Sequence, residues 1–285
     1  MQGAQASFLP DGRRLHLYHG PIDLIIEVFG SGRASAYQRC IAGFEGLLDC
    51  MVKDLTVLRA RLNAQSRTPN LSSPLSSHMV RATQPFADRF VTPMAAVAGA
   101  VADHMLELIC EDAEITKAYV NNGGDIAFHL SGEARLTTAL AGVGATVKLG
   151  ADSRCRGIAT SGWRGRSHSL GIADQVTALA ASAAQADVAA TLIANAVDLP
   201  LNTGILRRPA CELAPDSDLG TRAVTVHVPP LSLSDVQCAL ERGAALARNY
   251  QQRGLIHAAY LSLQDLALDI GAPDAPPLEL ETCHA

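Results

Sequence analysis

The sequence predicts an α+β fold, in which mainly antiparallel sheets pack with helices. Strand-like and helix-like segments come in blocks along the 285 residues rather than in strict alternation, which favours this class over a parallel α/β sheet. Hydrophobic residues make up 48% of the chain and aromatic residues 4%, so the core is expected to rest on aliphatic side chains and alanine. The charged fraction of 18% is too low for a disordered chain.

The first part of the chain predicts two strands followed by helices. Apolar runs indicate strands at residues 13–19 and 22–29. Apolar residues at three- and four-residue spacing then predict one long helix over 34–62. A loop rich in Ser and Pro is expected at 64–77, and a second helical stretch is expected over 84–110.

The remainder of the chain is mainly strand-like, with Gly-rich connections. The predicted strands are short and lie at 118–120, 126–130, 135–141, 145–149, 156–160, 175–181, 221–228 and 255–263. Two helices are predicted among them, an alanine-rich one at 184–197 and one at 234–251.

We expect a single domain over residues 1–270, with sub-lobes at 1–112 and 113–270, and a loose C-terminal tail over 271–285.

The formal net charge of -5 argues against a nucleic-acid partner bound by bulk charge. Seven scattered cysteines without metal-site spacing are typical of reduced thiols. The sequence shows neither a leader-like nor a membrane-spanning segment, so we expect a cytoplasmic protein with no membrane partner. The sequence leaves open whether the protein forms a homo-oligomer.

Two familiar catalytic patterns are weak here. Gly30-Ser31-Gly32 after a strand imitates a dinucleotide-binding turn, but the third glycine is missing and Asp49 falls inside a predicted helix. Ser161, His168 and Asp174 follow the order of a hydrolase triad, but no Gly-x-Ser-x-Gly elbow surrounds the serine. We therefore expect neither a dinucleotide-binding turn nor a triad hydrolase.

The first of three chemically informative segments is Asn122-Gly123-Gly124-Asp125, which lies between two predicted strands. Asparagine and glycine tolerate positive φ, and glycines let backbone N–H groups approach a phosphate closely. The same pattern is typical of an ordinary hairpin, and spacing alone favours the hairpin.

The second segment ends a strand and continues into a basic loop. Its candidate residues are Thr160, Ser161, Gly162, Trp163, Arg164, Arg166, Ser167 and His168. Guanidinium groups match phosphate oxygens in geometry, so this loop is a candidate anion site. A solvated basic loop with a structural tryptophan is an equally good interpretation.

The third segment places Asp187 and Thr191 four residues apart, so that both side chains project from one face of a predicted helix. A carboxylate and a hydroxyl are hard oxygen ligands of the kind that Mg²⁺ requires. Taken alone, the pattern fits better with an acidic residue that the helix dipole favours in a first turn.

Together, and in this order, the three segments resemble the ApbE family, the FAD:protein FMN transferases. The family's N-x-G-G-D turn, A-T-S-G strand end and A-D-A-x-A-T helix have counterparts at residues 122–125, 159–162 and 186–191. The chain is still more similar to a short, uncharacterised ApbE-like branch of bacteria and archaea, over most of residues 13–265. This resemblance implies an ApbE-like α+β fold.

The resemblance also implies ligands and roles. Asp187 and Thr191 would bind Mg²⁺, the Gly-Gly turn and the basic loop would hold FAD or FMN, and Asp187 and His168 would be catalytic. The implied activity is Mg-dependent FMN transfer or pyrophosphate cleavage, with a nucleotide cofactor and an unidentified acceptor protein as partners.

The family also has a stretch H-I-I-D-P-x-T-G, whose counterpart here is residues 168–174. His168 is present, but the family's Asp-Pro and Thr-Gly are absent. The sequence therefore leaves open whether the protein is an enzyme. The alternative is a protein that binds a flavin- or pterin-type cofactor without catalysis, as a carrier or assembly factor. A step in one-carbon cofactor metabolism is a third interpretation.

Overall fold

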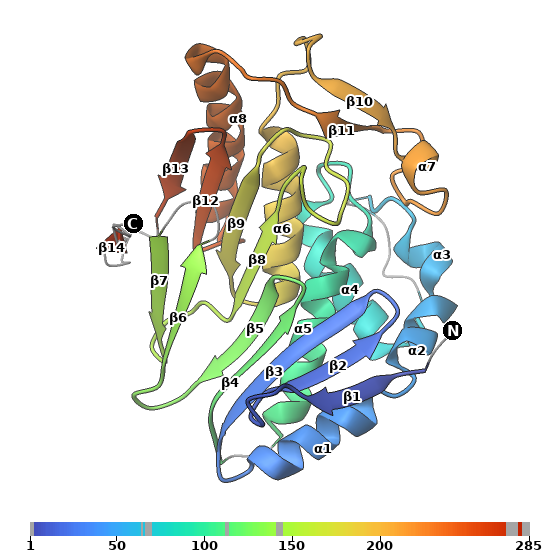
Figure 1. Cartoon of the computed structure of the whole chain (residues 1–285). Coiled ribbons are helices and arrows are strands. Elements are labelled where there is room, and N and C mark those ends of the chain that lie inside the picture. The colour runs from blue at the N-terminus through green and yellow to red at the C-terminus, as the bar shows by residue number, and fades with distance from the viewer. Residues whose placement is uncertain are drawn as a thin grey trace. The chain divides into compact units, whose positions relative to one another are not determined.

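Residues 3–63, 65, 70–111, 114–140, 145–271 and 279–280 are described by the computed structural model (Figure 1). The chain divides into two units that interleave along the sequence. The first unit comprises Met1–Thr137, Lys148–Ala159 and Ala180–Asp187, and the second comprises Thr138–Val147, Thr160–Leu179 and Val188–Ala285. Most of the tail expected over 271–285 lies outside the described residues.

Antiparallel strands form the sheet of the first unit. In spatial order they are β1 (Gln5–Phe8), β2 (Leu15–His19), β3 (Ile22–Gly30), β4 (Ile115–Asn122), β5 (Asp125–Leu130) and β8 (Gly157–Ser161). Residues of β3 alternate between buried and partly exposed, because one face of the sheet packs on helices. The predicted α+β class with antiparallel pairing is confirmed.

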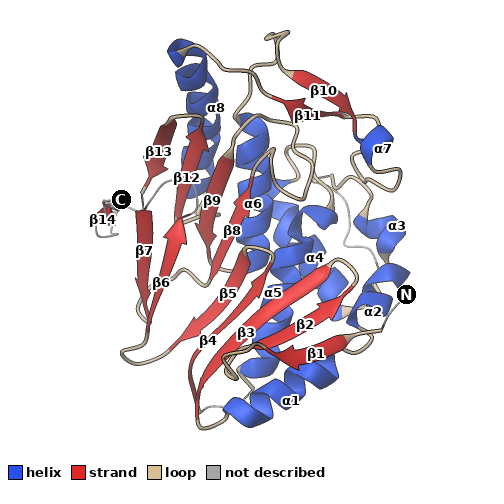
Figure 2. Ribbon diagram, viewed as in Figure 1, coloured by secondary structure: helices blue, strands red, loops and turns tan. Residues whose placement is uncertain are grey.

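Helices cover one face of this sheet, as Figure 2 shows. The helix α5 (Val97–Ile109) lies against β4 and β5, and both α1 (Arg33–Phe44) and α4 (Pro74–Thr83) pack on α5. Short 3-10 turns, η1 (Gln84–Phe86) and η2 (Pro93–Ala96), connect α4 to α5. The core between the layers includes the fully buried side chains of Leu24, Ile26, Met105 and Val120.

The prediction of one helix over residues 34–62 is wrong. The structure has three helices there, α1, α2 (Leu47–Lys53) and α3 (Leu55–Leu58). Gly46 adopts a left-handed conformation with a φ of 75°, which interrupts the helix. Asp54 separates α2 from α3, and its carboxylate accepts a hydrogen bond from the Ser72 N–H at 3.0 Å.

The loop predicted over 64–77 is too long, because α4 begins inside it. Ser73 caps this helix, since its hydroxyl oxygen accepts a hydrogen bond from the Leu75 N–H at 3.2 Å. Pro74 occupies the first turn, where its missing N–H costs nothing. The Ser-Pro pair is therefore a helix start.

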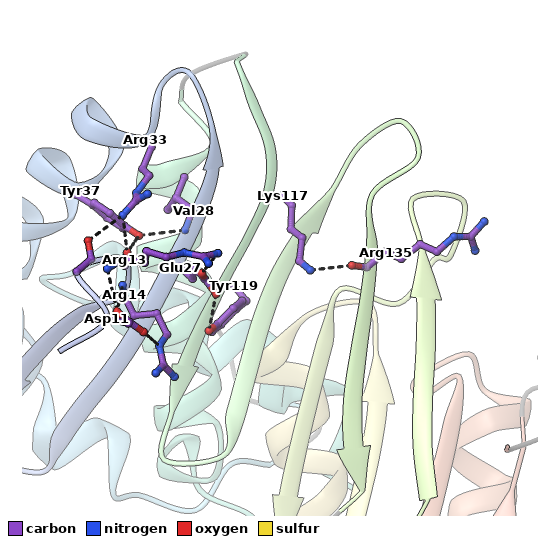
Figure 3. Close-up of polar contacts among 11 residues, drawn as sticks. Asp11, Arg13, Arg14, Glu27, Val28, Arg33, Tyr37, Lys117, Tyr119 and Arg135 are labelled. Atoms are coloured by element: carbon purple, nitrogen blue, oxygen red, sulfur yellow. Dashed lines mark hydrogen bonds and ion pairs between the residues drawn. The ribbon is translucent and has the colours of Figure 1, made fainter. Parts of the chain in front are cut away.

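A network of polar contacts fixes the segment before β2 to the sheet (Figure 3). The Tyr37 hydroxyl donates to the Arg13 carbonyl at 2.6 Å and accepts from the Val28 N–H at 3.2 Å. The Glu27 carboxylate accepts from the Arg13 guanidinium at 2.9 Å and from the Tyr119 hydroxyl at 3.1 Å. Side chains from two strands, β3 and β4, and from the helix α1 thus hold this segment.

Asp11 closes the turn before β2, so the pKa of its carboxyl group reports whether this turn forms. The carboxylate accepts hydrogen bonds from the Arg13 and Arg14 N–H groups, at 2.9 and 3.0 Å, and from Arg14 Nε at 2.5 Å. These bonds favour the charged form and lower the pKa of Asp11 from 3.8 to about 2.

Because the folded pKa of Asp11 lies below its unfolded value, its contribution to stability is present above about pH 4 and is lost as the pH falls through about 2. We expect an NMR titration of the Asp11 side-chain carbonyl carbon to give a midpoint near 2. A midpoint at the ordinary value of 3.8 would show that the turn does not form in solution.

The second unit contains a further set of antiparallel strands with one long helix. The strands β9 (Gln175–Ala180), β12 (Ala258–Leu263) and β13 (Leu266–Ile270) pair in that order, and α8 (Leu233–Gln252) packs on β12 and β13. The helix α6 (Ala183–Ala196) starts in the first unit and continues into the second. Within the described ranges, no helix is both long and apolar enough to cross a lipid bilayer.

Two small sheets complete the described structure. The hairpin of β10 (Leu206–Pro209) and β11 (Ala223–His227) encloses α7 (Ala210–Leu213), and neither β10 nor α7 was predicted. The strands β6 (Arg135–Leu140), β7 (Ala145–Gly150) and β14 (Glu279–Leu280) form a sheet of order β14-β7-β6.

Candidate functional site

The Gly-Gly turn joins β4 to β5 as a tight hairpin. Gly123 and Gly124 have φ values of 64° and 116°, at which a residue with a side chain is strained. The Asn121 side-chain oxygen accepts a hydrogen bond from the Gly124 N–H at 2.8 Å and closes the turn. Asn122 is buried, and its side-chain amide donates to the Ala98 carbonyl at the start of α5, at 3.0 Å. The turn is thereby tied to α5.

Asp187 lies in the second turn of α6 and contacts the start of α5. Its Oδ2 atom accepts a hydrogen bond from the Gly99 N–H at 3.1 Å. Burial raises the pKa of Asp187 well above its ordinary value, and the nearby Asp125 carboxylate raises it further. The N–H groups of Gly99 and Ala98 act in the opposite direction, because they stabilise the charged form.

The charges that act on Asp187 come from two carboxylates, Asp125 at the start of β5 and Asp103 on α5. A divalent cation would offset this concentration of negative charge. Within the described part of the chain, no three His, Cys, Asp or Glu side chains come together as a metal site. A metal ion at Asp187 would therefore take further ligands from hydroxyl groups, backbone carbonyls or water, a donor set that fits Mg²⁺.

Thr191 follows Asp187 by four residues on α6, so the two side chains share a helix face, as predicted. Thr191 is partly buried. It belongs to the second unit, whereas Asp187 ends the last segment of the first unit.

The second predicted segment begins at the end of β8, where the chain is closely packed. Thr160 Oγ1 lies 2.9 Å from Thr177 Oγ1, and Ser161 is partly buried. Gly162 is buried, and a Cβ atom there would lie 2.2 Å from the Asp174 carbonyl oxygen. Only glycine fits at this point, so the start of the loop is fixed.

The Asp174 carboxylate holds the first two side chains of the loop. Its Oδ1 atom accepts from Trp163 Nε1 at 3.0 Å and lies 3.2 Å from Arg164 Nε, whose guanidinium carbon lies 5.0 Å from the tryptophan ring centroid. Its Oδ2 atom accepts from the Gln264 N–H at 2.6 Å. None of the contacts of Asp174 in the described structure involves His168, so the two side chains do not form the acid–base pair of a triad.

The tip of the loop is exposed and consists of Arg166, Ser167 and His168. In the described structure, their side chains make no hydrogen bond or ion pair with another described residue. Ser169, which follows, is buried, and its hydroxyl donates to the Asn195 side-chain oxygen at 3.1 Å. The loop tip therefore extends from a well-anchored segment, and its polar groups are accessible to a ligand.

Sequence reasoning missed the residues that hold α6 in the first unit, Gly99 and Asp103 on α5 and His78 on α4. The available signal was the spacing of four residues between Gly99 and Asp103, which places both on one face of a helix. The spacing does not show which segment these two residues contact, because the N–H group that Asp103 binds lies 80 residues further along the chain.

Comparison with known proteins shows what the chain is similar to. A UPF0280 protein from Methanothrix thermoacetophila is 38% identical over 129 residues, which are 44% of this chain and 52% of that protein. This chain thus spans about half the length of the curated relative that it matches.

Two solved structures cover nearly all of the chain at low identity. The apo flavinyl transferase ApbE from Pseudomonas stutzeri is 14% identical with a TM-score of 0.44, over 94% of this chain and 96% of that one. The ApbE protein of Thermotoga maritima is 11% identical with a TM-score of 0.47, over 93% and 96%. The family model described as AbpE bacteria matches residues 6–272. The chain therefore belongs to the AbpE family of bacteria.

Proposed function

We propose that this chain binds a flavin nucleotide, FAD or FMN, and that it cleaves the FAD pyrophosphate in the presence of Mg²⁺. The observation that carries this proposal is the environment of Asp187, a partly buried carboxylate that accepts a hydrogen bond from the Gly99 N–H and lies near Asp125. Membership of the family and the three ApbE-like motifs support the choice of ligand.

Several of the predicted residues have a role in this proposal. Asp187 and Thr191 would hold a Mg²⁺ ion, which would withdraw negative charge from the pyrophosphate. The glycine N–H groups of the Gly-Gly turn and the guanidinium of Arg166 would bind phosphate oxygens, because both are donors suited to anions.

The proposed reaction is a displacement at phosphorus. A hydroxyl of an acceptor protein, or water, forms a bond to the phosphorus atom on the FMN side of FAD. The P–O bond to the AMP side breaks, and AMP leaves with that oxygen. His168, which is exposed at the loop tip, would accept the proton of the attacking hydroxyl.

One observation favours a second function, the binding of a flavin- or pterin-type cofactor without catalysis. In the described structure the Arg164 guanidinium forms an ion pair with Asp174, which leaves Arg166 as the guanidinium of this loop that has no described ionic partner. A loop with fewer cationic contacts stabilises a transition state less strongly.

The experiment that separates these functions is incubation of the full chain with FAD and Mg²⁺, followed by chromatography of the nucleotides. Cleavage predicts AMP in an amount equal to the FMN that is released or attached to an acceptor. FAD that binds without yielding AMP supports the non-catalytic function. If FAD does not bind, either with or without Mg²⁺, the result contradicts FAD cleavage and also contradicts FAD as the cofactor of the non-catalytic function.

A further inference from the structure

Helices α5 and α6 each supply a carboxylate to the first turn of the other. Asp103 of α5 accepts hydrogen bonds from the N–H groups of Ala183 and Ala184 at the start of α6, both at 2.9 Å. In return, Asp187 of α6 accepts from the Gly99 N–H near the start of α5, at 3.1 Å. The first N–H groups of a helix have no partner within that helix, so each carboxylate satisfies donors that would otherwise be buried without acceptors.

Both contacts lie on one face of α5. Gly99 and Asp103 are four residues apart, so they share a helix face. A Cβ atom at residue 99 would lie 2.2 Å from the Ala183 carbonyl oxygen and 2.6 Å from the Ala184 nitrogen. The missing side chain at Gly99 therefore lets α6 approach closely enough for both carboxylates to bind.

His78 restrains the Asp103 carboxylate from the other side. Its Nε2 atom lies 3.0 Å from Asp103 Oδ2, and α4, which carries it, packs on α5. The Asp103 side chain is 11% exposed, so its oxygens have little access to water. Ser182 completes the first turn of α6, because its hydroxyl oxygen accepts from the Gln185 N–H at 3.2 Å.

We propose that Asp103, restrained by His78, is a positioning residue that sets the place of α6 and thereby the place of the Asp187 carboxylate. It does so without touching the ligand of Asp187. The proposal rests on the proposed function only where it treats Asp187 as a metal ligand. The geometric part can be tested with the protein alone.

The test of the geometry is NMR hydrogen exchange of the Gly99, Ala183 and Ala184 amides in the full chain. In Asp103→Asn, we expect all three amides to exchange at least about tenfold faster, because the bonds to a charged acceptor are lost. The Gly99 amide is the diagnostic one, since it binds Asp187 and not Asp103. The matched control is Glu107→Gln, which neutralises an exposed acid on the same helix and should leave all three rates unchanged.

Faster exchange at Ala183 and Ala184 with an unchanged rate at Gly99 would overturn the proposal, because Asp103 would then be a local cap. If Asp103→Asn does not fold, His78→Phe provides the test. It removes only the group that restrains Asp103, and it should accelerate exchange at the same three amides to a smaller extent. Unchanged rates in His78→Phe would overturn the proposal.

A second measurement connects positioning to metal binding. Residues behind a metal ligand change the metal affinity by about 10- to 100-fold when they are replaced. We expect the dissociation constant for Mn²⁺, followed by EPR, to rise by about tenfold in Asp103→Asn and to stay constant in Glu107→Gln. Wild-type affinity in Asp103→Asn would contradict the proposal. A wild-type chain that binds no Mn²⁺ would instead contradict the proposed function, while the Gly99 exchange rates still decide the role of Asp103.

Discussion

Replacement of Asp187 by alanine is expected to lower the Mg²⁺-dependent rate of AMP release from FAD by at least about a hundredfold. A bound metal supplies several kcal/mol of charge stabilisation, and each factor of ten in rate corresponds to about 1.4 kcal/mol. Asp187 is the carboxylate that the Gly99 N–H orients, so its loss removes the proposed metal site. The measurement is the initial rate at saturating FAD as the Mg²⁺ concentration varies.

Two further variants make this result specific. Asp187→Asn keeps an oxygen that can accept from the Gly99 N–H, so it removes the charge and preserves the contact with α5. If Asp187→Asn loses as much rate as Asp187→Ala, the loss is caused by removal of the negative charge. Asp216→Ala removes an exposed carboxylate of the second unit and should keep the wild-type rate. A change of less than about threefold in Asp187→Ala would contradict the metal role.

Replacement of Gly99 by alanine is expected to destabilise the first unit by about 1–3 kcal/mol or more, the usual range for an overpacked core. The added Cβ would lie 2.2 Å from the Ala183 carbonyl oxygen, which is backbone and cannot rotate away. Gly157→Ala should have a similar effect, because its Cβ would lie 2.1 Å from the Ala183 nitrogen. The measurement is the midpoint of chemical denaturation.

Gly43→Ala is the matched control for this steric effect. It also adds a methyl group to a helix, but the nearest atom is Leu108 Cδ1 at 2.4 Å, the end of a flexible side chain. Alanine is favoured over glycine inside a helix by roughly 0.5–1 kcal/mol, so the net change should be small. Equal destabilisation by Gly43→Ala and Gly99→Ala would refute the close approach of α6 to α5.

The strand β3 could be predicted because apolar side chains run almost without interruption through residues 22–29. The break between α1 and α2 could not, because the apolar spacing continues across it. Phe44, Met51 and Leu58 are all buried, although they lie on three helices. Packing against one core preserves the periodicity, whereas the left-handed Gly46 interrupts the backbone between α1 and α2.

The candidate site could be predicted only where its geometry is local. Spacing alone placed Asp187 and Thr191 on one helix face and predicted the hairpin at Gly123 and Gly124. The contacts of Asp187 are long-range, since Gly99 lies 88 residues away along the chain. No local pattern in the sequence reports such a pairing.

Calorimetric titration of the full chain with FAD in the presence of Mg²⁺ tests the central claim most directly. We expect saturable binding, which weakens when EDTA removes the metal and when Asp187 is replaced by alanine. Saturable binding that is equally strong under all three conditions would contradict the metal site. The absence of any binding of FAD in the presence of Mg²⁺ would contradict a flavin nucleotide as the ligand of this protein.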